Sequence, residues 1–145
     1  MKIMMRRFCV LLFMAVLPIA SAIAHDTKNV PCSVDTQFGD DANGVFTAFV
    51  LKFQYKNTSR RTIGGVSVLV RDKAGEIVNN SDADCNIAAA GLEAGDAGQC
   101  EKVLQVITGK MSQKVGYDIW VKMIDDQKQK LSGAHSCEVT GVRYK

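Results

Sequence analysis

The chain has 145 residues, of which 18 are basic and 15 are acidic, so its formal net charge is +3. The first 24 residues include three basic residues and no acidic one, and their removal leaves 15 of each sign. A charge-balanced chain of 121 residues suits one domain and offers no electrostatic basis for binding nucleic acid or an anionic membrane.

The first 24 residues have the form of a secretory signal peptide. Basic residues precede a short apolar run from Phe8 to Ile19, and the small residues from Ala20 to Ala24 fit the A-x-A cleavage pattern. We expect cleavage after Ala24, a single mature domain over residues 25–145, and export to the periplasm or the medium. An uncleaved anchor is the alternative, but the apolar run is short for a bilayer.

Alternating apolar and polar residues predict β-strands along most of the mature chain. The clearest alternation lies in residues 45–57, 64–72 and 114–125, and weaker strands are expected near Asn29–Asp35, Glu76–Asn79, Gln99–Ile107 and His135–Tyr144. No stretch of ten residues shows a helical stripe, and "TGKMSQ" and "DDQKQK" are interpreted as turns. These features predict an all-β fold, namely an antiparallel two-sheet sandwich of about seven strands, of fibronectin type III or immunoglobulin-like type.

Four cysteines remain once Cys9 is removed with the signal peptide, and an even number in an exported chain predicts two disulfides. The segment from Cys85 to Cys100 is rich in Ala and Gly and buries too little surface to hold itself in place. A disulfide closing this loop is worth about 3 kcal/mol in the chain-entropy model. We therefore predict Cys85–Cys100 and Cys32–Cys137, while the other pairings stay open because sequence alone does not fix connectivity. No C-x-x-C motif occurs, so neither a metal site nor a cofactor is expected.

Few residues suit catalysis. His25 lies at the expected new N-terminus. His135 is followed directly by Ser136, but neighbouring residues on a strand point to opposite faces, so these two side chains cannot act together. Because a hydrolytic triad needs its histidine beside the nucleophile, we expect a protein that is not an enzyme. The sequons Asn57-Thr58-Ser59 and Asn79-Asn80-Ser81 are interpreted as turn chemistry rather than as glycan sites.

Trp120, Arg60 and Arg61 are the candidate binding residues. Trp and Arg dominate interface energies, and Trp120 is predicted on the polar face of a strand, between Asp118 and Lys122. The alternative for Trp120 is that it covers a sheet edge within the fold.

One string resembles a known structural corner. In "GLEAGDAGQC", Leu92 and Gly95 match the L-x-P-G-T-x-Y corner of fibronectin type III domains, whereas Ala94 replaces the proline and Gly98 the tyrosine. More widely, the segments "PCSVDTQFGDDANGVF", "LKFQYKNTSRRTIGGVSVLVRDKAG" and "SDADCNI" resemble the secreted interleukin receptor mimic proteins of pathogenic enterobacteria, which are fibronectin type III-like.

This resemblance implies a secreted virulence protein that captures host interleukins by mimicking a cytokine receptor, and a domain-swapped homodimer. Glycine-containing connections at Gly64-Gly65 or Thr108-Gly109 are candidate hinges for such a swap. The alternative function is a periplasmic inhibitor of a host enzyme such as lysozyme.

Overall fold

A computed structural model describes residues 29–42 and 44–145, so the predicted signal peptide and His25 lie outside the described residues. The strands are β1 (Asn29–Asp41), β2 (Gly44–Lys56), β3 (Ile63–Arg71), β4 (Ile77–Cys85), β5 (Ala97–Thr108) and β6 (Ser136–Tyr144). The helices are α1 (Lys110–Val115) and α2 (Tyr117–Leu131), with a 3₁₀ turn at Ile87–Ala89. Within these residues, neither helix combines the length and apolar character needed to cross a membrane.

The strands form a closed barrel rather than a sandwich. All pairs are antiparallel, in the order β1-β2-β5-β4-β3-β6. The all-β class is right, but the two-sheet sandwich of about seven strands is wrong. Two short pairings make the difference, because β1 joins β6 over three residue pairs and β4 joins β5 over two. These two seams connect β1-β2-β5 to β4-β3-β6, which a sandwich would leave as separate sheets.

Each seam also carries a disulfide. Cys85 lies opposite Cys100 in the β4–β5 register and is bonded to it. Cys32 is bonded to Cys137 beside the β1–β6 pairing. Both predicted disulfides are therefore confirmed, and each lies where the backbone pairing is thinnest.

The barrel interior follows the predicted alternation in β2 and β3. The inward residues of both strands are buried in one core, namely Leu51, Phe53, Tyr55, Val66, Val68 and Val70. This face assignment from sequence is confirmed for these residues, whereas Phe49, expected on the same face, packs in a separate cluster with Ile107 and Leu131. Gly64 and Gly65, one of the two candidate hinges, lie buried inside β3 rather than in a connection.

Two strands are longer than the sequence pattern predicts. β1 continues from Asp35 to Asp41, and β4 runs to Cys85 through the sequon at residues 79–81, which is therefore strand and not turn. The added residues are mostly polar, so they show no apolar–polar alternation. They are strands because the backbone of β1 pairs with β2 and that of β4 pairs with β3. Pairing of this kind needs no apolar face on the added residues.

The predicted strand at 114–125 is wrong, because these residues form the end of α1 and most of α2. The apolar alternation ends at Met123, whereas Trp120, Ile124 and Leu131 follow the helical repeat and pack with Phe49 and Ile107. The residues "DDQKQK", interpreted as a turn, are good helix formers and lie inside α2. Lys122 and Asp126 add an ion pair of 2.7 Å at spacing i, i+4.

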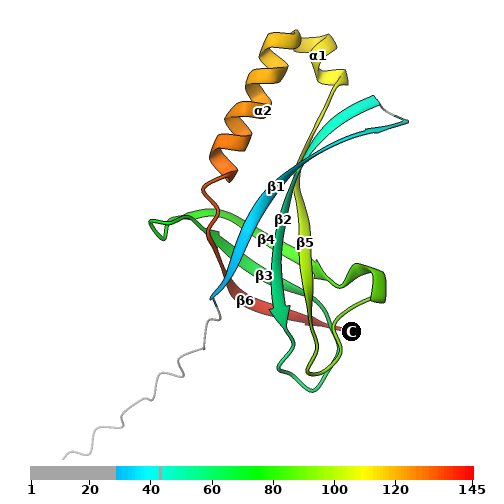
Figure 1. Cartoon of the computed structure of the whole chain (residues 1–145), viewed down its shortest axis with the longest axis vertical. Helices are drawn as coiled ribbons and strands as arrows, with labels where there is room; N and C mark the ends of the chain where they lie inside the picture. Colours follow the sequence, from blue (N-terminus) through cyan, green and yellow to red (C-terminus); the bar gives the residue numbers. More distant parts are fainter. Residues whose placement is uncertain (1–28, 43) are drawn as a thin grey trace, which may run out of the picture.

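The molecule is elongated because three strands continue beyond the barrel. Figure 1 shows β1, β2 and β5 running past the barrel, with α1 and α2 at the same end and the C-terminus at the other. We call residues 33–41, 44–52 and 102–108 of these strands the extension, and residues 110–131 the arm. The arm packs on one face of the extension through the Phe49, Ile107 and Leu131 cluster.

Candidate functional site: a groove between hairpin and arm

An apolar groove lies between the tip of the β1–β2 hairpin and the junction of the two helices. Its volume is about 410 Å³. The hairpin contributes Phe38, Val45, Phe46 and Thr47, and the arm contributes Tyr117 and Trp120. We call this hollow the arm groove.

Strand pairing sets the hairpin wall of the arm groove. Phe38 lies opposite Thr47 in the β1–β2 register, so both side chains share the face turned toward the arm. The next pair places Gly39 opposite Phe46, and a Cβ added to Gly39 would lie 2.4 Å from the Phe46 ring. Glycine at position 39 therefore lets the Phe46 ring lie across β1, an arrangement that stabilises a sheet edge.

A glycine between the helices sets the arm wall. Gly116 has φ +88°, a conformation that favours glycine, and it separates α1 from α2. Tyr117 is consequently the first residue of α2, and its ring centroid lies 5.8 Å from that of Trp120. The Trp120 indole is fixed because its Nε1 donates a hydrogen bond of 3.0 Å to the Thr108 carbonyl.

The rim of the arm groove leaves large aromatic side chains in solvent. Phe38 is 76% exposed and Tyr117 is 68% exposed. The hydroxyl of Ser112, which lies in the groove, donates a hydrogen bond of 2.7 Å to the Gly109 carbonyl. With that hydroxyl and the indole N–H already bonded, the groove offers mainly apolar contact.

The three predicted binding residues do not lie together. Trp120 is half-buried and packs against the Phe49 cluster, so it belongs both to the fold and to the wall of the arm groove. Arg60 and Arg61 are exposed in the β2–β3 connection, at the end of the molecule away from the arm. The Arg61 guanidinium lies 4.4 Å from the centroid of the Tyr144 ring, a cation–π contact within the chain.

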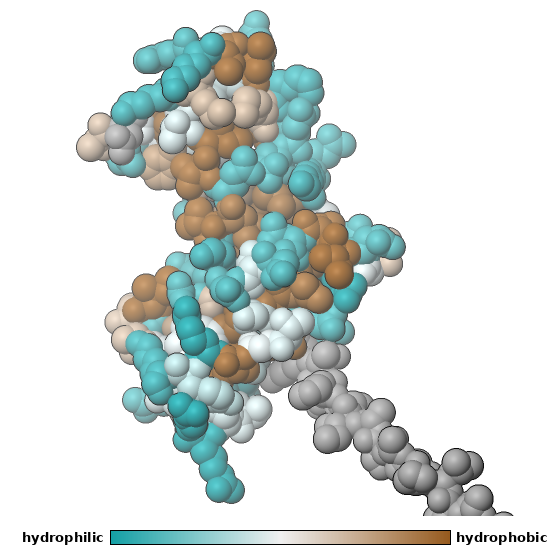
Figure 2. Space-filling view, turned by 180° about the vertical axis from the view of Figure 1, so that it is seen from behind, coloured by the Kyte–Doolittle hydropathy of each residue, from teal (hydrophilic) through white to brown (hydrophobic). Residues whose placement is uncertain are grey.

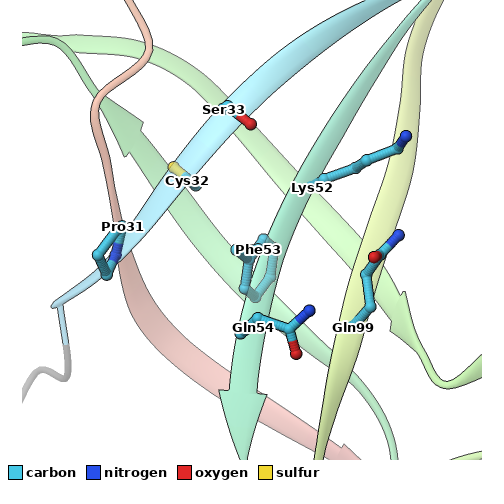
Figure 3. Close-up of a pocket in the computed structure, with 7 residues that line it drawn as sticks. All are labelled: Pro31, Cys32, Ser33, Lys52, Phe53, Gln54 and Gln99. Carbon is cyan, nitrogen blue, oxygen red and sulfur yellow. The ribbon is translucent and has the colours of Figure 1, made fainter.

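A second depression, of about 470 Å³, lies over β1, β2 and β5 at the barrel end of the extension (Figure 3). Figure 3 shows Lys52 and Gln99 beside it, and both have partners within the protein. Lys52 forms an ion pair of 3.0 Å with Asp35, and the Gln99 amide donates a hydrogen bond to Glu101. This depression is shallow, and its Lys52 and Gln99 side chains are already engaged within the protein.

Among the described residues, no group of three or more His, Cys, Asp or Glu residues could hold a metal ion. His135 is exposed just before β6, and its backbone is used to join strands, through Arg71 on one side and Cys32 on the other. Neighbouring Ser136 is half-buried at the start of β6.

No protein family model matches the chain, and neither a curated protein nor a solved structure is significantly similar to it. These comparisons identify neither a fibronectin type III domain nor an interleukin receptor mimic, so that resemblance stays a hypothesis.

Sequence reasoning missed Phe38 and Tyr117. Phe38 follows the predicted first strand, which ends near Asp35, and it lies among Gly39, Asp40 and Asp41. A lone Phe among Asp and Gly residues was the signal that could have found it, because burial does not explain it. Tyr117 lies within residues 114–125, which the alternation predicts as a strand, but it is the first residue of α2 and is exposed.

Proposed function

We propose that this chain is an exported, non-enzymatic binding protein whose contact surface is the arm groove and its aromatic rim. The observation that carries the proposal is the pair of exposed aromatics, Phe38 and Tyr117, facing one hollow of about 410 Å³. Contiguous exposed apolar surface on a soluble protein is typical of an interaction site, and aromatic side chains supply most interface energy.

The partner that we propose is a host cytokine of the interleukin class, captured by mimicry of its receptor. The sequence resemblance supports this choice, and the two disulfides are consistent with an exported chain. The apolar groove would receive one or two apolar side chains of the cytokine, with Phe38 and Tyr117 closing over them.

A second candidate is an inhibitor of a basic host enzyme such as lysozyme. The β1–β2 hairpin supports it, because it projects from the barrel and carries Asp40 and Asp41 close to the exposed Phe38. An acidic, aromatic hairpin complements the positively charged surface of such an enzyme.

Surface plasmon resonance of residues 25–145 against an interleukin panel tests the first candidate, and inhibition of lysozyme tests the second. We expect Phe38→Ala and Tyr117→Ala each to weaken the responding interaction by about thirtyfold, the loss typical of a central anchor. Ile87→Ala is the matched control, since Ile87 is equally apolar and exposed but lies in the 3₁₀ turn far from the arm groove.

Both variants remove exposed side chains, so the free energy of unfolding should be unchanged. Binding that survives Phe38→Ala and Tyr117→Ala would assign the function to another surface. Absence of saturable binding and of inhibition would reject both partner classes.

A further inference from the structure

One edge of β5 has no strand beside it in the extension. β4 pairs with β5 only at Asp84–Glu101 and Cys85–Cys100, and the two strands then diverge (Figure 1). Beyond Glu101, β5 pairs on one side with β2, and no strand of the described residues pairs with its other side. Backbone groups along such an edge are open to pairing with another strand.

Side-chain chemistry distinguishes this edge from the open edges of β1 and β4. The outer edge of β1 carries Asp35 and Asp40, and the outer edge of β4 carries the polar run from Asn79 to Asp82. Charges and polar residues are the usual protection against edge-to-edge pairing. Residues 103–107 of β5, "VLQVI", have no charge and no proline, and Val103 and Val106 are 50% and 48% exposed.

Val103 and Val106 are exposed on the extension. Their partners in the β2–β5 register, Val50 and Ala48, are buried, so the exposed apolar surface here comes from the two valines. Figure 2 shows hydrophobic surface gathered over the middle of the molecule, between more hydrophilic ends. The two exposed valines therefore lie on the strand whose edge is open.

We propose that two copies of this chain pair β5 to β5, antiparallel about a two-fold axis, to form one continuous sheet of β1, β2 and β5 from each copy. Such an interface closes on itself and leaves neither β5 edge open. In a register centred on Gln105, Lys102 lies opposite Thr108 of the other copy, and Glu101 lies opposite Gly109. No like charges then lie opposite each other, which removes the usual penalty on self-pairing.

A second copy fits this edge better than a foreign strand. The uncharged run is flanked by Glu101 and Lys102 at one end, so it holds no net charge that would select a charged peptide. Residues 25–145 carry 15 charges of each sign, and copies of such a chain repel one another little. The pairing uses residues outside the arm groove, so the proposal stands or falls separately from the proposed function.

Gln105 gives the sharpest test because it lies nearest the axis and is exposed on β5. We expect residues 25–145 to sediment as a dimer at micromolar concentration. Gln105→Lys and Gln105→Glu should each weaken the dimer by about tenfold or more, because each places like charges face to face. An equimolar mixture of the two variants should recover a dimer, since opposite charges then meet at the axis.

Gln37→Lys is the matched control, because Gln37 is an exposed glutamine on the open edge of β1, and it should leave the dimer intact. Circular dichroism checks that each variant stays folded. A monomeric wild type would overturn the proposal. So would a dimer that tolerates Gln105→Lys, as a strand-swapped dimer would, or one that dissociates on Gln37→Lys.

Discussion

Asn57 ties the two connections at the C-terminal end of the barrel to each other. Its side chain is 0% exposed, and its Nδ2 donates to the carbonyls of Arg61, Leu92 and Glu93 at 2.8, 2.9 and 3.0 Å. Its Oδ1 accepts from the backbone N–H and the hydroxyl of Ser59 at 2.9 and 2.7 Å. The Asn57 amide is therefore structural, and the sequon that it heads is not accessible to a glycosylating enzyme in the folded chain.

Asn57→Asp should destabilise the protein strongly. The substitution keeps the shape but replaces two N–H donors by carboxylate oxygen, which would face three carbonyl oxygens while buried. We expect a loss of about 3 kcal/mol or more in the free energy of unfolding, as for an uncompensated buried charge. Urea denaturation measures it.

Asn79→Asp is the matched control, because the Asn79 Oδ1 accepts from the Ser81 hydroxyl, which a carboxylate can also do. An equal loss in both variants would show that the donor network of Asn57 contributes nothing specific.

Tyr55 should make the folded state sensitive to alkali. Burial raises the pKa of the Tyr55 hydroxyl, and the nearby Tyr144 raises it further. As the pH rises above about 10, Tyr55 ionises in the unfolded chain before it ionises in the folded one. Stability is therefore unaffected by Tyr55 below that pH and falls above it, by at most about 1.4 kcal/mol per pH unit.

Urea midpoints at pH 9 and pH 11 measure this effect. Tyr55→Phe should lose less stability between the two pH values than the wild type. Tyr117→Phe, which changes an exposed tyrosine, should behave like the wild type. Identical losses in all three proteins would remove Tyr55 as the cause.

At the scale of elements, the two seams are where the barrel opens most readily. The β4–β5 seam has two residue pairs and the β1–β6 seam has three, whereas β2 and β5 pair along most of their length. Few backbone hydrogen bonds hold a short seam, so its local opening costs little free energy. The disulfides Cys85–Cys100 and Cys32–Cys137 add a covalent link to each seam, where there are few backbone hydrogen bonds.

Removing either disulfide by paired Cys→Ala substitution should lower the free energy of unfolding. The two bonds join residues 15 and 105 positions apart. The chain-entropy model gives about 3 kcal/mol for the short loop and about 4.7 kcal/mol for the long one. Hydrogen exchange should also rise first at the seam that loses its disulfide, and uniform exchange across the barrel would contradict this account.

The helical arm shows why one element could not be predicted from its pattern. Residues 115–123 alternate apolar and polar side chains as a strand does, whereas the face of α2 that packs on the extension carries Trp120, Met123 and Ile124. Only Met123 belongs to both sets, and the short window holds enough apolar residues to fit either period. The decision comes from tertiary packing against Phe49 and Ile107, which sequence does not show.

At the scale of the whole molecule, the positions of four strands were predictable and the closure of the barrel was not. β2, β3, β5 and β6 lie where alternation placed them. Whether six strands form two sheets or one barrel depends on the five residue pairs of the two seams, and no local pattern encodes them. The disulfides were more predictable than the closure. The composition of the loop between Cys85 and Cys100 predicted the first bond, and Cys32 and Cys137 were then the remaining pair.

The candidate site was less predictable than the fold. Trp120 was singled out and does line the arm groove, but its partners across the groove come from β1 and β2, about 80 residues earlier in the chain. Arg60 and Arg61 were chosen by residue type alone, and the fold carries them to the other end of the molecule. Residue type identifies candidate binding residues, but only the three-dimensional structure shows which of them lie together in one site.

The wide separation of Cys32 and Cys137 sets an order of events during synthesis. The chain emerges from its N-terminus, so Cys85 and Cys100 can meet when the β4–β5 segment has appeared, while Cys32 still has no native partner. β6, the last strand, pairs with both β1 and β3 and brings Cys137 with it. Until those final residues arrive, Cys32 lacks its native partner and the sheet is unclosed. A ribosome that stops before Ser136 therefore releases a chain that has no means of completing the barrel.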